Sequence, residues 1–341
     1  MKKFFLILGA GLFLAGKMQA QVPLQDSLLR MVKFKAYQIV EKRDTTRFYV
    51  YQTSPRPRHM LLFLDGSVPK PLFNYEYEKG QLKVYTWNHG EQHWLPEDYL
   101  YVLIARPGYA GVLSNAQIDS LNRHMPAVYL EKNSLDYRVR TADAVINYCR
   151  KKLLKDEGKT IVFGHSEGFN VVSRLLTVNK KITHGGLWCG SAMPDYYDFM
   201  IMKRRELYEG KVSDTLAARQ LDTMLNNYRE IFKDPGYAKP GSIYTNKRWI
   251  SYARGPIEDL KQVAIPLYQI IATQDSNAPY ESAFIVPLEF IRLGKTNLTL
   301  RTLIGGDHSL NTTSTEGKKV SHWKECFLDF ISWSEYLIRH K

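Results

Sequence analysis

Short, almost uninterrupted apolar runs recur along the chain and alternate with amphipathic stretches. Continuous apolar runs are typical of strands in a parallel sheet, because helices cover both faces of such a sheet. Strands are predicted at 33–40, 47–52, 59–64, 99–105, 160–163, 184–189, 266–272 and 298–304. Apolar residues at helical spacing predict helices at 134–154, 214–232 and 322–338. This order predicts an α/β protein with a mostly parallel sheet and helices on both faces.

A long polar and aromatic segment interrupts this alternation. It spans residues 191–265 and is rich in Tyr, Met, Trp and Arg. We therefore predict a core formed by residues 21–190 and 266–341, and a helical cap formed by the insert. The aromatic side chains of the insert either line a pocket or form its own core, and the second interpretation is favoured.

Residues 1–20 have a different character from the rest of the chain. A basic start precedes an apolar run at 4–14, and small residues follow before Gln21. This is the layout of a secretory signal peptide, and the run is too short to span a bilayer. We expect cleavage after Ala20 and a secreted or periplasmic protein without stable membrane insertion. An uncleaved membrane anchor is the alternative.

The charge and the cysteines add little to this picture. The formal charge is +13, and removal of the three lysines in the leader leaves +10. The basic residues are dispersed and match no nucleic-acid-binding motif, so a solvated surface is favoured over substrate steering. Cys149, Cys189 and Cys326 lie in apolar segments without zinc-site spacing, and we expect buried free thiols. We predict no metal site, no cofactor and no nucleic-acid partner.

The motif Gly164-His165-Ser166-Glu167-Gly168 is the strongest chemical signal in the sequence. It joins the predicted strand at 160–163 to a helical segment at 170–176. A serine at such a sharp turn has a strained backbone, and its flanking positions need glycine because a side chain would collide with the strand or the helix. The turn exposes the hydroxyl group. The motif therefore predicts that Ser166 is a nucleophile, with an ordinary loop serine as the alternative.

Serine needs a base to take its proton, and the base needs an acid to orient it. Because ligands bind at the carboxyl ends of parallel strands, the partners of Ser166 are sought in the loops that follow them. Asp275 and His308 each follow a predicted strand. The order Ser166, Asp275, His308 is the one expected when the nucleophile lies on a strand–helix turn. Asp195 is the alternative acid.

Other residues near the strand ends are weaker candidates. The backbone N–H of Glu167 and that of Gly66 or Ser67 are expected to form an oxyanion hole. Arg106 and Tyr109 are candidate pocket residues, with Arg106 as a possible partner for a substrate carboxylate. His165 is expected to point away from the hydroxyl of Ser166, and Asp307 is expected to cap its own loop.

Together these segments resemble the α/β-hydrolase family over residues 45–340. The resemblance rests on residues 164–168, 272–275, 305–308 and 64–67, the last of these where the family often has His-Gly. Asp65 and Phe169 depart from the family pattern, and Phe169 stands where many members have a small residue. The resemblance implies an eight-stranded fold, a Ser-His-Asp triad, no cofactor, and a cap at 191–265 between the sixth and seventh strands.

These observations predict a serine hydrolase that cleaves a carboxylic ester through a covalent acyl-enzyme. The sequence most resembles secreted bacterial hydrolases of the esterase and serine-peptidase type. A peptidase or amidase acting on short peptides is the first alternative, because the same groups serve both reactions. An acyltransferase and a non-catalytic binding protein with the same fold are the others.

Overall fold

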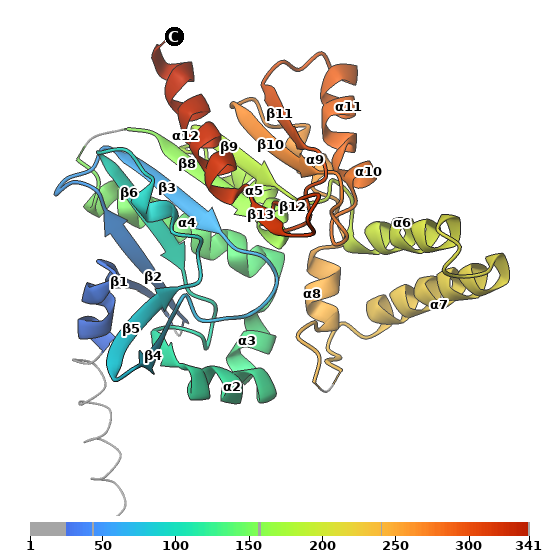
Figure 1. Cartoon of the computed structure of the whole chain (residues 1–341), viewed down its shortest axis with the longest axis horizontal. Helices are drawn as coiled ribbons and strands as arrows, with labels where there is room; N and C mark the ends of the chain where they lie inside the picture. The colour runs from blue at the N-terminus through green and yellow to red at the C-terminus, as the bar shows by residue number, and fades with distance from the viewer. Residues whose placement is uncertain (1–24, 43, 156–157, 240, 340–341) are drawn as a thin grey trace, which may run out of the picture.

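A computed structural model describes residues 25–42, 44–155, 158–239 and 241–339, so the predicted signal peptide lies outside the described residues. An eight-stranded sheet runs through the molecule in the order β1-β2-β6-β3-β8-β9-β10-β11 (Figure 1). Strand β2 is antiparallel to both of its neighbours, β1 and β6, and all other neighbouring strands are parallel. The strands are β1 (Lys35–Glu41), β2 (Asp44–Gln52), β3 (His59–Leu64), β6 (Tyr99–Ile104), β8 (Thr160–His165), β9 (His184–Trp188), β10 (Leu267–Ala272) and β11 (Leu298–Leu303).

The sheet confirms the predicted fold class, and each of its strands overlaps one of the predicted strands. The reason lies in their burial. Nearly every residue of β6, β8, β9 and β10 is buried. Strands that are buried on both faces have few polar positions, and they therefore stand out in a sequence.

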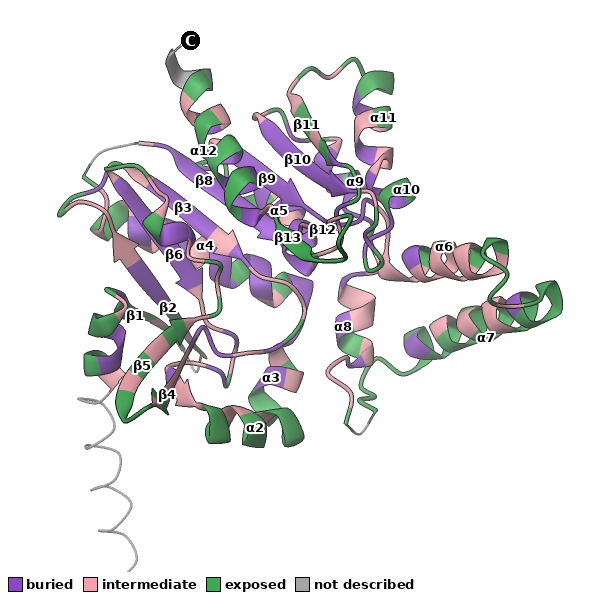
Figure 2. Ribbon diagram, in the orientation of Figure 1, coloured by how far each residue is buried: buried purple, intermediate pink, exposed green. Residues whose placement is uncertain are grey.

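Helices cover both faces of the sheet, as Figures 1 and 2 show. Met60, Leu62 and Leu64 of β3 pack on one face with α4 (Leu135–Lys152), α5 (Glu167–Val178), α9 (Ile257–Leu260) and α11 (Ile285–Arg292). The alternate residue Leu61 packs on the other face with a helix at residues 25–31 and with α12 (Trp323–Arg339). Alternate strand residues thus enter two separate apolar cores, as the two-residue period of a strand requires.

Smaller elements surround this core. A hairpin joins residues 73–78 to residues 81–86, and its turn residues Lys79 and Gly80 have positive φ angles of 49° and 78°. The helices α2 and α3 were not predicted from the sequence. All three cysteines are buried and free, as expected. The remaining elements outside the insert are β4 (Phe73–Glu78), β5 (Gln81–Thr86), η1 (Glu91–His93), β7 (Val112–Ser114), α2 (Asn115–Arg123), α3 (Ala127–Lys132), α10 (Tyr280–Ala283), β12 (Asn311–Thr313) and β13 (Lys319–Ser321).

The insert forms α6 (Asp195–Tyr208), α7 (Asp214–Lys233) and α8 (Asn246–Ser251), followed by α9. Helices α6 and α7 lie side by side and project away from the sheet (Figure 1). Most residues of α7 are exposed, whereas most of those of α6 are half-buried (Figure 2). Helix α9 instead packs on α5 within the core, so the last part of the expected cap belongs to the core. Among the described residues, no helix has the length and apolar character needed to cross a bilayer.

Candidate active site

Ser166 lies at the sharp turn between β8 and α5. Its φ of 58° and ψ of −126° are strained for a residue with a side chain. A Cβ atom added to Gly164 would lie 2.2 Å from the carbonyl oxygen of Gly168, and one added to Gly168 would lie 2.0 Å from that of Leu64. The two glycines therefore let the helix and β3 approach the turn closely. Helix α5 begins directly at Glu167, earlier than the sequence indicated.

Phe169, the large residue in the first turn of α5, is fully buried. It packs against Gly190, where an added Cβ would lie 2.3 Å from the Cβ of Phe169. The missing side chain at the end of β9 thus provides the space for the phenyl ring.

We expect Gly190→Ala to destabilise the protein by about 1–3 kcal/mol through overpacking. Denaturant unfolding measures the loss. Adding Phe169→Leu should restore part of it, so the double variant should lose less stability than the two single losses added together. Strict additivity would contradict the packing argument.

Asp275 and His308 meet at the carboxyl ends of β10 and β11. The Nδ1 atom of His308 lies 2.8 Å from Oδ2 and 3.0 Å from Oδ1 of Asp275. Asp275 is almost fully buried, and its Oδ1 also accepts hydrogen bonds from the N–H groups of Asn277 and Ala278 at 2.8 Å. These donors fix the carboxylate, which in turn fixes the imidazole with Nδ1 toward the acid and leaves Nε2 to act as a base.

Ser166 and His308 both line a cavity of 680 Å³. The hydroxyl of Ser166 has no hydrogen-bond partner among the described residues, and no bond joins it to His308. In proteins without substrate, such catalytic bonds are often long and tighten only when substrate is bound. The arrangement places a free hydroxyl and an oriented imidazole at the same opening.

Three neighbouring residues, His165, Asp195 and Asp307, make contacts of their own around the site. His165 also lines the cavity, and its Nε2 donates to the carbonyl oxygen of His308 at 2.7 Å. Burial lowers the pKa of His165 to about 3, so its ring is neutral and supports the His308 loop. Asp195, the alternative acid, forms an ion pair with Arg248 at 2.7 Å. Asp307 caps its loop as expected, accepting from the N–H groups of Ser309 and Asn311.

The loop after β3 lies directly against the serine. A Cβ atom on Gly66 would lie 3.3 Å from the Cβ and 3.5 Å from the Oγ of Ser166. Arg106 donates to the carbonyl oxygen of Gly66, and Tyr244 donates to the hydroxyl of Ser67 at 2.8 Å. Within the described ranges, the N–H groups of Gly66 and Ser67 have no acceptor. The N–H of Glu167, at the start of α5, also lacks a partner within its helix.

No protein-family model matches this sequence, and no curated protein matches it. Solved structures do. The acylaminoacyl peptidase of Pyrococcus horikoshii aligns with 91% of this chain at 14% identity and a TM-score of 0.55, although this chain spans only 43% of that protein. Est1E from Butyrivibrio proteoclasticus aligns at 13% identity over 90% of this chain and 99% of its own, with a TM-score of 0.52. A Pyrococcus furiosus esterase aligns at 14% identity over 90% and 91%, with a TM-score of 0.51. The chain has the α/β-hydrolase fold.

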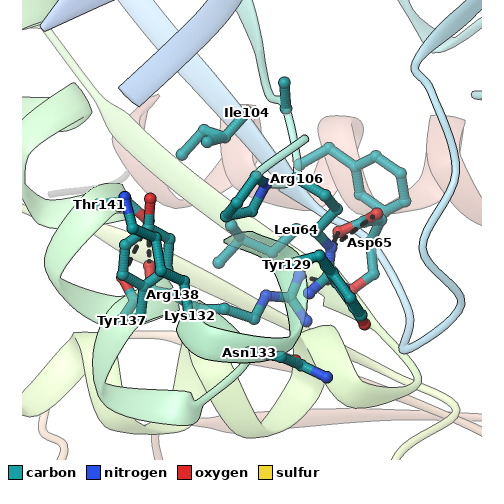
Figure 3. A pocket seen from close by; sticks show the side chains of 13 residues that line it. Leu64, Asp65, Ile104, Arg106, Tyr129, Lys132, Asn133, Tyr137, Arg138 and Thr141 are labelled. Atoms are coloured by element: carbon teal, nitrogen blue, oxygen red, sulfur yellow. Dashed lines mark hydrogen bonds and ion pairs between the residues drawn. The ribbon is translucent and has the colours of Figure 1, made fainter. Parts of the chain in front are cut away.

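In this α/β-hydrolase fold, Asp65 lies directly after β3, next to Gly66. It forms ion pairs with Arg138 at 2.7 Å and with Arg106 at 3.3 Å, and Figure 3 shows the three side chains together. Arg106 is buried, and its Nη2 lies 3.6 Å from Oε1 of Glu167. It does not line the 680 Å³ cavity. The expectation that Arg106 binds a substrate carboxylate therefore does not fit, because protein carboxylates already surround it. Tyr109 is also buried away from this cavity, with its ring edge-on to Tyr129.

Glu167 joins this α/β-hydrolase core to the insert. Its carboxylate is buried and forms ion pairs at 2.7 Å with Arg138 of α4 and with Arg248 of α8. Burial alone would raise the pKa of Glu167, but Arg248, Arg138 and Arg106 hold it well below its usual range. The sequence does not identify Arg138 and Arg248 as parts of the site, because their partners are distant along the chain.

Proposed function

We propose that this protein is a serine hydrolase that cleaves carboxylic esters of small molecules. One observation supports it above all others. A strained serine on a strand–helix turn shares a cavity with a histidine that is oriented by a buried aspartate. Ordinary loop serines need none of these features. The fold is also found in esterases and in serine peptidases.

In the proposed reaction, the Oγ of Ser166 bonds to the ester carbonyl carbon while its proton passes to Nε2 of His308. The N–H groups of Glu167 and of Gly66 or Ser67 stabilise the negative charge on the carbonyl oxygen. The C–O bond of the ester then breaks, and the departing alcohol takes the proton from His308. Water repeats these steps on the acyl-enzyme, releasing the acid and regenerating Ser166.

A fluorophosphonate probe tests the proposal, because it labels only activated serines. We expect the wild-type protein to be labelled and to hydrolyse p-nitrophenyl esters, and we expect Ser166→Ala to lose both activities. Circular dichroism of the variant checks that it is folded. Absence of labelling in folded wild-type protein would contradict the proposal, and turnover by Ser166→Ala would assign the nucleophile elsewhere.

Amide hydrolysis is the second candidate, because acylaminoacyl peptidases are among the structures that share the fold. Esters and anilides with the same acyl group distinguish the two activities. Higher kcat/KM for the anilides, after correction for their lower intrinsic reactivity, would favour a peptidase. Inclusion of an added alcohol or amine acceptor in the same assay detects acyl transfer through its product.

A further inference from the structure

Asp198 on α6 differs from the other carboxylates in the lining of the 680 Å³ cavity. Asp65, Glu167 and Asp195 each form an ion pair with arginine. Asp198 is only 4% exposed and has no basic partner among the described residues. Its Oδ1 accepts a hydrogen bond from the hydroxyl of Ser191 at 2.9 Å.

The surroundings of Asp198 favour a positive charge. Asp195 lies on the same helix and Asp275 in the loop after β10, and both add negative potential at its carboxyl group. Ser191 and Ser282 contribute hydroxyl groups without charge. The same cavity is also lined by Phe199 and Trp249, whose rings lie 6.0 Å apart. Aromatic faces attract ammonium groups, so the cavity offers both a carboxyl group and aromatic rings to a cation.

We propose that Asp198 forms a subsite for an ammonium group. The preferred substrates would then carry a free amine at the end that lies next to α6 of the insert. The inference rests on the proposed function, because it places the reacting carbonyl group at Ser166 and the amine at Asp198. An ammonium ion would supply a countercharge that allows Asp198 to ionise in the cavity. Alkyl and aryl groups of the same size would offer no such partner, so the carboxyl group would stay neutral and gain no ion pair.

The protonation of Asp198 depends on the groups around its carboxyl group. Burial raises its pKa to about 8, and the hydrogen bonds from Ser191 and Ser282 offset this only in part. Asp198 is therefore mostly neutral at pH 7 until a cation arrives. A ligand ammonium would stabilise the ionised form and lower this pKa again.

Matched p-nitrophenyl esters test the subsite. One series carries a terminal amine at increasing distance from the carbonyl group, and its control series carries a methyl group in place of each ammonium group. We expect the wild-type KM to be at least about tenfold lower for an amine of the correct length than for its control. In Asp198→Asn, which has nearly the same shape, this KM ratio should approach one. Asp195→Asn is the matched variant: it removes a carboxylate that pairs with Arg248 and leaves Asp198 in place, so the KM ratio should stay well above one.

The pH dependence separates a binding role from a structural one. The wild-type KM for amine esters should fall as the pH rises through about 8, because more Asp198 becomes ionised while alkylamines stay protonated. Division by the KM of the control ester removes any effect of His308 and Asp275, since both substrates share those groups. Asp198→Asn should abolish this dependence.

Three results would overturn the inference: a wild-type KM ratio near one for every chain length, a ratio that survives Asp198→Asn, or one that is lost only in Asp195→Asn. Calorimetry on Ser166→Ala with hexylammonium and hexanol gives the same comparison without turnover. If no ester is hydrolysed while hexylammonium still binds more tightly than hexanol in an Asp198-dependent way, the proposed function fails and the ammonium subsite stands. If hexylammonium shows no such preference, the subsite fails.

Discussion

Asp275→Asn should lower kcat for ester hydrolysis by about 10,000-fold, the size of loss seen when the acid of a Ser-His-Asp triad becomes an amide. The structure gives a specific reason. The two N–H groups of Asn277 and Ala278 bind the Oδ1 position, so the oxygen of the new amide stays there. Its NH₂ group then occupies the Oδ2 position, facing Nδ1 of His308 at 2.8 Å.

Such an amide would force His308 into the wrong tautomer. Nδ1 would have to accept a hydrogen bond from the NH₂ group, which places the proton on Nε2. A protonated Nε2 cannot take the proton of Ser166, so the fold and the cavity remain while the base is lost. Steady-state kinetics on a p-nitrophenyl ester measures the effect, and the unfolding midpoint shows that the variant is folded.

Asp195→Asn is the control for this prediction, because Asp195 is the other acid that follows a strand near the site. Its carboxylate binds Arg248 and makes no bond to His308, so its loss of kcat should be far smaller. A fall of less than about tenfold in Asp275→Asn would show that Asp275 does not orient the base. A larger loss in Asp195→Asn than in Asp275→Asn would reverse the assignment of the acid.

Arg248→Met should destabilise the protein by about 3–5 kcal/mol, because it removes one partner of a buried ion pair. The guanidinium is 2% exposed and donates to Oε2 of Glu167 from Nε at 3.2 Å and from Nη2 at 2.7 Å. Methionine fills much of the volume, but it leaves the carboxylate of Glu167 with less of the compensating charge. Urea unfolding followed by circular dichroism measures the change in the free energy of unfolding.

Arg254→Met is the matched control from the same insert. Arg254 pairs with Asp259 at 3.2 Å, but its side chain is 48% exposed. Water already solvates such a charge, so a loss of at most about 1 kcal/mol is expected. Equal losses in the two variants would contradict the importance of burial at Arg248.

Acidification provides a second check of Arg248→Met. Glu167 has a lowered pKa in the folded protein, so its contribution to stability is present above the pKa of the unfolded chain and is lost as the pH falls below it. The variant has less of this contribution to lose. The difference in stability between wild type and Arg248→Met should therefore be largest near neutral pH and shrink below about pH 4.

The strands and the turn at Ser166 could be predicted from the sequence because their signals are local. The fully buried strands allow few polar residues, and the turn at Ser166 needs glycine within a few positions on both sides. Asp275 and His308 were found because parallel strands bring their carboxyl ends to one edge of the sheet. The structure shows these two residues in contact, while their catalytic roles remain part of the proposal.

Arg106 shows why the rest could not be read in this way. Its place after a strand made it a candidate for binding substrate, yet the carboxylates of Asp65 and Glu167 lie next to it in the folded chain. Charge pairing depends on which side chains meet, and these are far apart in the sequence. The same holds for Asp198. It lies on the same helix as Asp195, but Asp195 pairs with an arginine, whereas Asp198 is more deeply buried and accepts a hydrogen bond from Ser191.

The sequence by itself determined the order of the strands along the chain, the strained serine and its candidate partners, because these depend on burial and on backbone sterics within short segments. Only the tertiary structure decided which charges neutralise one another, that α9 belongs to the core, and that the insert sends Arg248 to Glu167 and Asp198 to the cavity. Those outcomes depend on distances between elements, and electrostatic energy changes steeply with distance and burial.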